Sequence, residues 1–439
     1  MSKKKRETFT NSSGFVLSCI GAAVGLGNIW MFPYKMGQNG GAVFLIPYFL
    51  CVILLGTTGL IAEFAFGRAN QGGAFKSIKD SFTERKLKFG SLFGITPAIG
   101  LVGIFVFYNI VVGWIMKYFT MSLTGKINKI NIPTFFDGFA GSSETVVWTF
   151  LAMLMAALII GFGAVKGIEK VNNIIMPGLF LIFIALAVRS LTLPGAIDGV
   201  KYLLTPKWEY LFKANTWVMA MGQAFFSVSL NGCGMMVYGS YMKKEFDIPK
   251  IAFTTAILDS AAALLAAFVI MPAAFAFGLD PAAGPQLLFV TVPTIFEKMP
   301  AGRILAIFFF LSMIFAAFSS AVNMLEGSVE SFMTQLKSKR KNTALIIAFI
   351  SFIIAIPLSL SMNLFDNFTN FVTIVLSPLG ALITFSVFFY IFDKERAMDE
   401  INLGSSLKLG EGFRLFGKYG FVFITILIII LGVMYGGIG

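Results

Sequence analysis

Residues 21–28 read GAAVGLGN and residues 229–234 read SLNGCG, and each stretch interrupts an apolar segment long enough to cross a membrane. Glycine weakens a helix by about 1 kcal/mol relative to alanine, and it lets the backbone open where that backbone lines a cavity. The two stretches fall in the first and sixth apolar segments, at corresponding places of two five-segment blocks. Close helix packing through small residues would explain either stretch alone. Two in register favour an inverted-repeat transporter, in which paired broken helices form the binding site.

The composition indicates an integral membrane protein whose surroundings are a lipid bilayer. Of the 439 residues, 57% are hydrophobic and 13% are charged, against about 25% charged residues in soluble domains. Lipid can act as the solvent for helix exteriors that water could not accept. The net charge of +12 is no sign of nucleic-acid binding, because no basic stretch is interleaved with aromatic residues outside the apolar segments. We therefore predict no nucleic-acid partner.

Eleven segments are candidates for membrane-spanning helices, since a span needs roughly 20 mostly apolar residues. They lie near 14–37, 41–67, 90–123, 145–163, 168–192, 215–241, 249–276, 302–334, 343–361, 365–392 and 414–438. The expected fold is all-α, with about eleven transmembrane helices and discontinuous spans 1 and 6. Residues 1–439 then form one transporter domain. Its first repeat covers residues 1–192 (spans 1–5), its second covers 215–392 (spans 6–10), and span 11 follows at 414–438.

The distribution of basic residues predicts the orientation in the membrane. With the N-terminus inside, 24 of the 34 Lys and Arg residues lie on the cytoplasmic side. We therefore expect a multi-pass protein of the cell (inner) membrane, with a cytoplasmic N-terminus and an extracytoplasmic C-terminus.

The residue inventory argues against an enzyme. His is absent, and the three Cys residues lie inside apolar segments without metal-ligand spacing. A membrane-embedded hydrolase would need paired catalytic groups at one depth, for which only Glu63 and Asp259 are available. We expect no enzymatic cofactor.

Broken helices suit a zwitterion and a sodium ion. The freed N–H groups of a half-helix favour a carboxylate, and the freed carbonyl groups supply the oxygen ligands that a hard cation prefers. Ionisable residues at membrane depth mark candidate sites, so we predict a functional role for Asp259. For Glu63 we predict a structural role, in which it accepts hydrogen bonds from the unwound backbone. The serines in these spans can also bond back to their own helices.

Several motifs carry a family resemblance that runs from residue 6 to the end of span 11. Residues 25–34, GLGNIWMFPY, resemble the GLGNxWRFPY signature of the neurotransmitter:sodium symporters, and residues 39–48, NGGAVFLIPY, continue it. Further matches are residues 166–170 (KGIEK), 222–230 (GQAFFSVSL) and 316–320 (AAFSS). The resemblance implies sodium-coupled amino-acid symport by alternating access, with spans 1, 2, 6 and 7 rocking against spans 3, 4, 8 and 9. An amino-acid sensor or a channel on the same scaffold is the alternative.

The resemblance also implies two sodium sites and one substrate site. The first sodium would use the Ala23 carbonyl, Asn28, Ser227, Asp259 and the substrate carboxylate. The second would use the carbonyls of Gly21, Val24 and Ala316 with the hydroxyls of Ser319 and Ser320. The substrate carboxylate would meet the amides of Leu26 and Gly27 and the hydroxyl of Tyr108, with Ala23 and Ser227 close by. The substrate side chain would be enclosed by Ile104, Phe226 (as the lid), Ser229, Gly232, Ser320 and Met324.

This sequence departs from the family pattern at the gates. Met31 replaces the signature's usual Arg, and its usual acidic partner falls at Thr369, so we expect the outer gate to close through apolar contact. On the cytoplasmic side Arg6 and Tyr241 remain. The acidic residue expected there falls at Thr334, and Glu330, one turn earlier, is the candidate substitute.

Two residues lead to finer predictions. Gly232 stands where family members often carry a bulky residue, so we expect an enlarged side-chain pocket that admits a large hydrophobic or aromatic amino acid, tyrosine first. Asn231 or Ser229 could meet a phenolic hydroxyl. Asp259 supplies a fixed negative charge where chloride-dependent relatives bind an anion, so chloride should not be required. The sequence predicts no oligomeric state.

Overall fold

The structure is a computed structural model that describes residues 7–161, 163–279, 287–336 and 338–435. Throughout these ranges the chain forms helices, turns and irregular segments, with no strand. The predicted all-helical fold is therefore confirmed.

Within the described ranges, nine helices are long and apolar enough to cross a membrane: Gly41–Asn70, Gly90–Thr124, Ser143–Gly161, Gly167–Leu191, Ile248–Ala276, Gly302–Met333, Arg340–Leu360, Met362–Ile391 and Glu411–Tyr435. A tenth span is formed by the pair Ser12–Ala23 and Gly27–Gln38, which is bent by 60°. The sixth predicted span is divided into two shorter helices, so the count of eleven stays a prediction.

The segment predicted as the first repeat contains the helices α1 (Ser12–Ala23), α2 (Phe32–Gln38), α3 (Leu45–Cys51), α4 (Thr57–Asn70), α6 (Gly90–Thr124), α8 (Ser143–Gly161) and α9 (Ala164–Leu191). The segment predicted as the second repeat contains α11 (Ala214–Ser227), α12 (Gly234–Gly239), α13 (Ile248–Ala276), α15 (Gly302–Leu336), α16 (Arg340–Leu360), α17 (Met362–Phe371) and α18 (Ser377–Ser386). The last span consists of α20 (Glu411–Leu415) and α21 (Val422–Tyr435). Wider π-helical turns join several of these pieces: η1 (Gly27–Met31), η3 (Val52–Gly56), η7 (Val372–Leu376), η8 (Val387–Ile391) and η9 (Phe416–Phe421).

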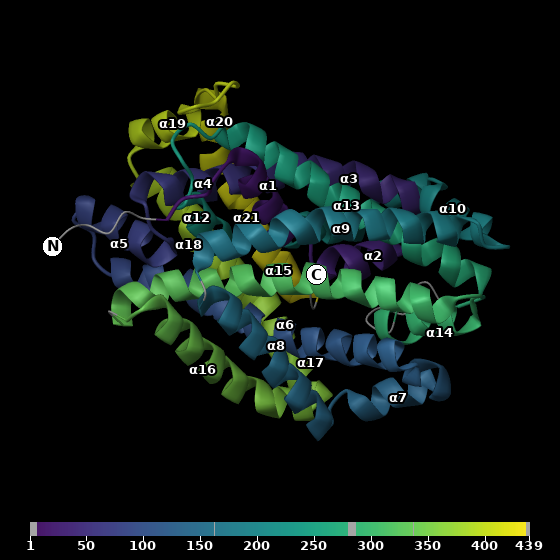
Figure 1. Ribbon diagram of the computed structural model, residues 1–439. Coiled ribbons are helices and arrows are strands. Elements are labelled where there is room, and N and C mark those ends of the chain that lie inside the picture. The colour runs from purple at the N-terminus through teal and green to yellow at the C-terminus, as the bar shows by residue number, and fades with distance from the viewer. Residues whose placement is uncertain (1–6, 162, 280–286, 337, 436–439) are drawn as a thin grey trace.

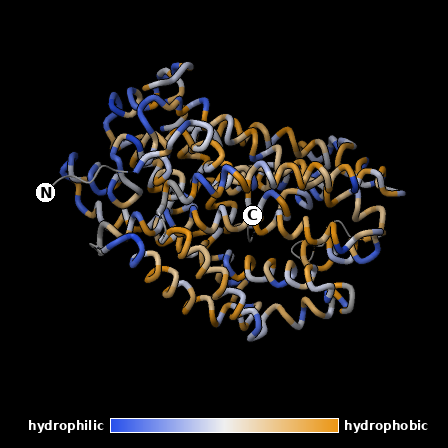
Figure 2. The backbone as a smooth tube through the Cα atoms, viewed as in Figure 1, coloured by the Kyte–Doolittle hydropathy of each residue, from blue (hydrophilic) through white to orange (hydrophobic). Residues whose placement is uncertain are grey.

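Shorter helices connect the spans at the two ends of the bundle. They are α5 (Ala74–Glu84), α7 (Ile132–Phe139), α10 (Ala196–Leu204), α14 (Val292–Lys298) and α19 (Lys394–Asn402). Figure 1 places α5 and α19 at the end that carries the N-terminus, and α7, α10 and α14 at the opposite end. Figure 2 shows hydrophilic residues gathered toward these ends and hydrophobic residues along the helices between them. This is the pattern of a bundle whose middle lies in lipid.

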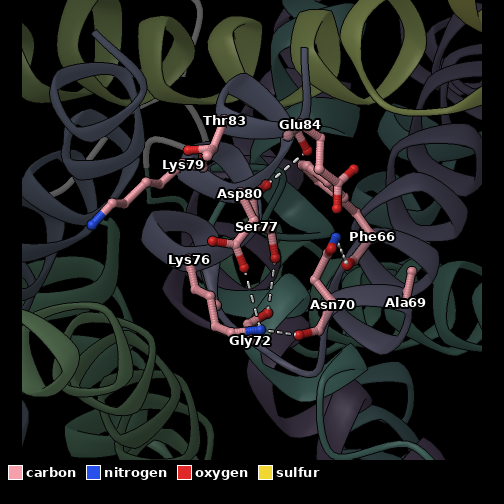
Figure 3. Close-up of polar contacts among 12 residues, drawn as sticks. Phe66, Ala69, Asn70, Gly72, Lys76, Ser77, Lys79, Asp80, Thr83 and Glu84 are labelled. Atoms are coloured by element: carbon pink, nitrogen blue, oxygen red, sulfur yellow. Dashed lines mark hydrogen bonds and ion pairs between the residues drawn. The ribbon is translucent and has the colours of Figure 1, made fainter. Parts of the chain in front are cut away.

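Polar contacts fix the loop between α4 and α5 at the N-terminal end (Figure 3). The side-chain amide of Asn70 donates to the Phe66 carbonyl at 3.0 Å, and the Ser77 hydroxyl donates to the Gly72 carbonyl at 3.2 Å. The Lys76 ammonium donates to the Asn70 carbonyl. The Lys76 bond satisfies a carbonyl that the end of α4 leaves free.

Arg68 joins three segments at this same end. Its guanidinium pairs with the Glu400 carboxylate of α19 at 2.5 Å and donates to the Phe246 carbonyl, in the loop before α13, at 2.8 Å. A further bond reaches the Leu403 carbonyl. Because Arg68 presents several donors in a rigid fork, one residue ties α4 to both neighbouring segments.

Candidate functional site

The first span opens at residues 24–26. The α1 helix ends at Ala23, and Val24 takes an extended backbone conformation (φ −67°, ψ 109°). The chain resumes as η1 and α2 at an angle of 60°. This break leaves carbonyl groups at the end of α1 and N–H groups at the start of η1 without helical partners.

The sixth span opens at residues 228–233, between α11 and α12. Two residues there have left-handed backbone conformations, Ser229 (φ 58°) and Gly232 (φ 74°). Residues other than glycine rarely adopt a positive φ, so the surroundings hold Ser229 in a strained backbone conformation. Its hydroxyl donates to the Ala22 carbonyl at 2.9 Å, which connects the two breaks directly.

A first group of oxygen atoms surrounds Asp259 of α13. Its carboxylate accepts hydrogen bonds from the Asn28 amide at 2.8 Å and from the Ser227 hydroxyl at 2.5 Å. The Asn28 amide also lies 3.0 Å from the Ser227 hydroxyl, and its oxygen accepts the Gly25 N–H at 3.0 Å. All three side chains are buried. The tertiary fold thus brings together three side chains from η1, α11 and α13 that can offer oxygen to a cation.

A second group of oxygen atoms lies between α1 and α15. The Ser320 hydroxyl is 3.3 Å from the carbonyl oxygens of both Gly21 and Val24. The Ser319 hydroxyl donates to the Ala316 carbonyl at 2.9 Å. These five residues are the ones that the resemblance assigns to a second sodium.

A cavity of about 730 Å³ lies at the two breaks and extends toward the end of the bundle that carries α7. Its walls include these residues of the predicted substrate and sodium sites: Ala23, Leu26, Gly27, Asn28, Ile104, Tyr108, Phe226, Ser227, Ser229, Ser320 and Met324. The Leu26 N–H donates to the Tyr108 hydroxyl at 3.4 Å. Phe226 lies against Gly27, where ring atoms would be 3.0 Å from an added β-carbon. The residues that sequence reasoning assigned to a substrate therefore share one cavity, with Gly232 as the exception.

The predicted role of Gly232 in enlarging that cavity is corrected by the structure. Gly232 is not among the lining residues. A β-carbon there would point at α18, 2.6 Å from the Thr384 hydroxyl and 2.7 Å from the Gly380 carbonyl. The positive φ turns the residue away from the cavity, and its neighbour Asn231 lines the wall instead.

Glu63 of α4 holds the second half of the broken span. One carboxylate oxygen accepts the Gly232 N–H at 3.0 Å, and the other accepts the Met236 N–H at 3.0 Å. Glu63 is fully buried and is not among the residues that line the cavity. An acceptor with a negative charge suits the N-terminal end of α12, where N–H groups lack helical partners.

The part of the cavity farthest from the breaks carries acidic and neutral residues. Met31 and Thr369, the two departures from the family's charge pair, both line it. Asp137 of α7 and Asp366 of α17 line it as well. Sequence reasoning did not single out these two carboxylates, because exposed acidic residues near the end of a span carry no signal of their own.

Tyr241 belongs to a polar network with the buried Glu326 of α15 and with Arg340 of α16. Its hydroxyl donates to the Glu326 carboxylate at 2.5 Å and lies 3.1 Å from a guanidinium nitrogen of Arg340. Arg340 and Glu326 form an ion pair. Glu326 was missed, although a carboxylate in the middle of an apolar span is a recognisable signal.

The remaining residues of that predicted gate are only partly placed. The Glu330 carboxylate accepts the Gly73 N–H at 2.7 Å, just before α5. Arg6 lies outside the described residues, and the side chain of Thr334 is likewise not described. The pairing of Arg6 with an acidic residue stays a prediction.

Comparison with known proteins places the chain among transporters. The model of the "Sodium:neurotransmitter symporter family" matches residues 6–133 and 137–437. The "Uncharacterized sodium-dependent transporter YhdH" of Bacillus subtilis is 35% identical, with 98% of each chain covered. The "Uncharacterized sodium-dependent transporter MJ1319" of Methanocaldococcus jannaschii is 31% identical, covering 93% of this chain and 87% of its own. The crystal structure of MhsT in complex with L-phenylalanine superposes with a TM-score of 0.86 at 35% identity, covering 97% of this chain and 99% of MhsT.

Proposed function

Because the chain belongs to the sodium:neurotransmitter symporter family, we propose that it couples sodium entry to the uptake of a large, aromatic amino acid, with L-tyrosine as the first candidate. A sodium-dependent, multi-pass membrane transporter is not an enzyme, and the site needs no covalent chemistry. The N-terminal end of the bundle is proposed to face the cytoplasm, in the cell (inner) membrane, with the C-terminus outside.

The observation that carries this proposal is the meeting of both helix breaks in one cavity beside the Asp259 carboxylate. The N–H groups of Leu26 and Gly27 lie at the start of the second half of span 1, where they favour a substrate carboxylate. Asn28, Ser227 and Asp259 offer oxygen for a sodium ion next to it. A substrate carboxylate would then contact this sodium directly, so each ligand would strengthen the binding of the other.

A second sodium is proposed at the oxygen group between α1 and α15, formed by Gly21, Val24, Ala316, Ser319 and Ser320. This group connects α1, the first half of the broken span 1, to the continuous helix α15. A ligand shifts a conformational equilibrium only through its differential affinity for the two states. Sodium at this place would favour the state in which α1 rests on α15, and its release would favour the alternative. The Asp259 carboxylate supplies fixed negative charge, so transport is proposed to need no chloride.

The choice of tyrosine rests on Asn231 and Ser229. The Asn231 side-chain oxygen accepts the N–H groups of Cys233 at 3.0 Å and Gly234 at 2.9 Å, which fixes the orientation of the amide. Its NH₂ group is then a donor on a residue of the cavity wall. The Ser229 hydroxyl, already donating to the Ala22 carbonyl, can still accept. A phenolic hydroxyl could accept from the first residue and donate to the second.

This arrangement sets an expected preference. A hydrogen bond contributes about 0.5–1.5 kcal/mol net, which corresponds to roughly 2- to 13-fold in affinity. Two such bonds to the phenolic hydroxyl, about 1–3 kcal/mol together, predict that tyrosine is preferred over phenylalanine by about fivefold or more. The phenylalanine bound to MhsT supports an aromatic substrate class.

Uptake of labelled tyrosine into proteoliposomes tests the proposal, with an inward sodium gradient, a potassium gradient or no gradient. Accumulation above equilibrium in sodium alone is the expected result. Sodium-dependent binding without accumulation would instead assign the chain to the sensor class, and dissipation of a tyrosine gradient without coupling would indicate a channel.

Asn231→Ser is the matched variant for substrate choice. A serine hydroxyl can still cap the N–H groups of α12, but it is too short to offer a donor to the substrate ring. The ratio of tyrosine to phenylalanine uptake should fall toward one while phenylalanine uptake is retained. An unchanged ratio would remove Asn231 from the specificity argument and leave symport untouched.

A further inference from the structure

An amide oxygen on α9 lies buried without a hydrogen-bond partner. Asn172 is 2% exposed, and its NH₂ group donates to the Ile168 carbonyl one turn earlier at 3.0 Å. This bond fixes which side of the amide carries the oxygen. Among the described residues, that oxygen has no donor. Leaving a buried acceptor unsatisfied is costly, and such a group in a native fold calls for an explanation.

The Asn172 oxygen points at Gly21 of α1. A β-carbon added to Gly21 would clash with this oxygen and would lie 3.2 Å from the β-carbon of Ser319. Asn172 and Ser319 therefore flank the same glycine, from α9 and α15 respectively. Only the absence of a side chain on Gly21 lets the amide oxygen approach so closely.

Gly21 is itself part of the second oxygen group, because its carbonyl lies 3.3 Å from the Ser320 hydroxyl. That group takes its oxygen atoms from α1, from Val24 just after it, and from α15. Asn172 brings a neutral oxygen with free lone pairs to its edge, from a third helix. A sodium ion binds carbonyl and amide oxygen atoms as ligands. An oxygen that is already buried and unpaired needs no further removal from water, so its contact with a buried cation stabilises the site.

We propose that the side-chain oxygen of Asn172 is a further ligand of the sodium ion bound between α1 and α15, supplied by α9 on the side of Gly21. The proposal rests on the second sodium site of the proposed function and extends it by one residue and one helix. It assigns a role to an oxygen that packing alone leaves unexplained.

The proposal also connects sodium to the start of α9. One turn before Asn172, the Glu169 carboxylate accepts hydrogen bonds from the backbone N–H of Thr10, at 3.1 Å, and from its hydroxyl, at 2.9 Å. Glu169 also lies against Gly14 of α1. The N-terminal half of α9 is thus attached to the segment before α1 and, through Asn172, to the proposed ion. Sodium bound there would hold α9 against α1 at the N-terminal end.

The test compares Asn172→Leu, which removes the oxygen at similar volume, with Asn173→Leu. Asn173 is exposed on the outer face of α9 and serves as the matched control. The thermal unfolding midpoint of the purified protein in detergent is measured as a function of sodium concentration, with choline as the replacement cation and no amino acid present. A ligand at free concentration c that binds only the folded state stabilises it by RT ln(1 + c/Kd), so the rise of the midpoint with sodium concentration yields the dissociation constant of sodium.

Asn172→Leu should be at least as stable as the wild type in choline, because the unsatisfied oxygen is gone. Its dissociation constant for sodium should rise about tenfold or more, the scale on which loss of a supporting oxygen weakens metal sites. Asn172→Asp, which keeps an oxygen, should retain a sodium response, and Asn173→Leu should match the wild type. In an Asp259→Asn background, which impairs the first oxygen group, the sodium response that remains should depend on Asn172.

Two outcomes overturn the inference: a sodium dissociation constant of Asn172→Leu within twofold of the wild type, or an equal rise of the dissociation constant in Asn173→Leu. If the wild type itself shows no response to sodium, the proposed function is contradicted, and the inference that rests on it falls with it. If the wild type responds but transports no tested amino acid, the substrate assignment fails while the role of Asn172 stands on its own data.

Discussion

Replacing Glu63 by Gln should loosen the broken sixth span without touching the cavity wall. In the wild type, the two carboxylate oxygens of Glu63 accept the N–H groups of Gly232 and Met236, each at 3.0 Å. Gln keeps one oxygen and turns an NH₂ group toward the other N–H. One buried backbone donor is then left facing a donor, at a cost of about 1–3 kcal/mol, and the remaining bond loses the benefit of a charged acceptor, about 1 kcal/mol.

The sum, about 2–4 kcal/mol, sets the size of the effect. Unfolding entropies near 2.1 cal/mol/K per residue imply that a protein of 439 residues loses about 2–4 °C in unfolding midpoint for this change. Glu63→Leu removes both acceptors and should roughly double the loss. The local consequence is larger than the global one, because the affected N–H groups begin α12 and position the break at residues 228–233. Sodium-dependent substrate binding should weaken by tenfold or more.

The assay is thermal unfolding of the purified variants in detergent, followed by sodium-dependent tyrosine binding. Glu245→Gln, an exposed carboxylate at the same end of the bundle, controls for loss of a negative charge. An unfolding midpoint of Glu63→Gln within 1 °C of the wild type, together with unchanged binding, would refute the idea that this carboxylate holds the broken helix.

Three further predictions follow from the packing and the charges. Gly67→Ala should destabilise the fold strongly, since a β-carbon there would clash with a backbone carbonyl of α12, whereas Gly138→Ala, with open space around it, should leave the unfolding midpoint unchanged. Asp259→Asn should weaken sodium-dependent uptake tenfold or more and make it respond to chloride; equal initial rates in chloride and gluconate would contradict this. Arg340→Ala leaves the buried Glu326 carboxylate without its ion-pair partner, a change that typically costs about 3–5 kcal/mol, and should open the N-terminal end. Faster maleimide labelling of the native cysteines would reveal the opening, and an unchanged labelling rate would count against a gate at this ion pair.

The sequence alone determined the class of the fold and the places where its helices break. Span lengths and hydropathy depend on local composition, so the predicted segments agree with the observed helices to within a few residues, as for 249–276 against Ile248–Ala276. Glycine-rich runs mark broken helices because the backbone itself becomes permissive there. This local signal, together with the family resemblance, identified Asn28, Ser227 and Asp259 as site residues. The fold brings their polar side-chain atoms within 3.0 Å of one another.

Only the tertiary structure decided which way individual groups point. Gly232 and Asn231 are neighbours, yet a positive φ turns the first toward α18 and leaves the second on the cavity wall. The network of Tyr241, Glu326 and Arg340 joins residues up to 99 positions apart, and no periodicity in the sequence encodes such a meeting. The Asn172 oxygen became informative for the same reason. Whether a buried polar atom has a hydrogen-bond partner depends on what the whole fold places around it, and the sequence specifies only that the atom is present.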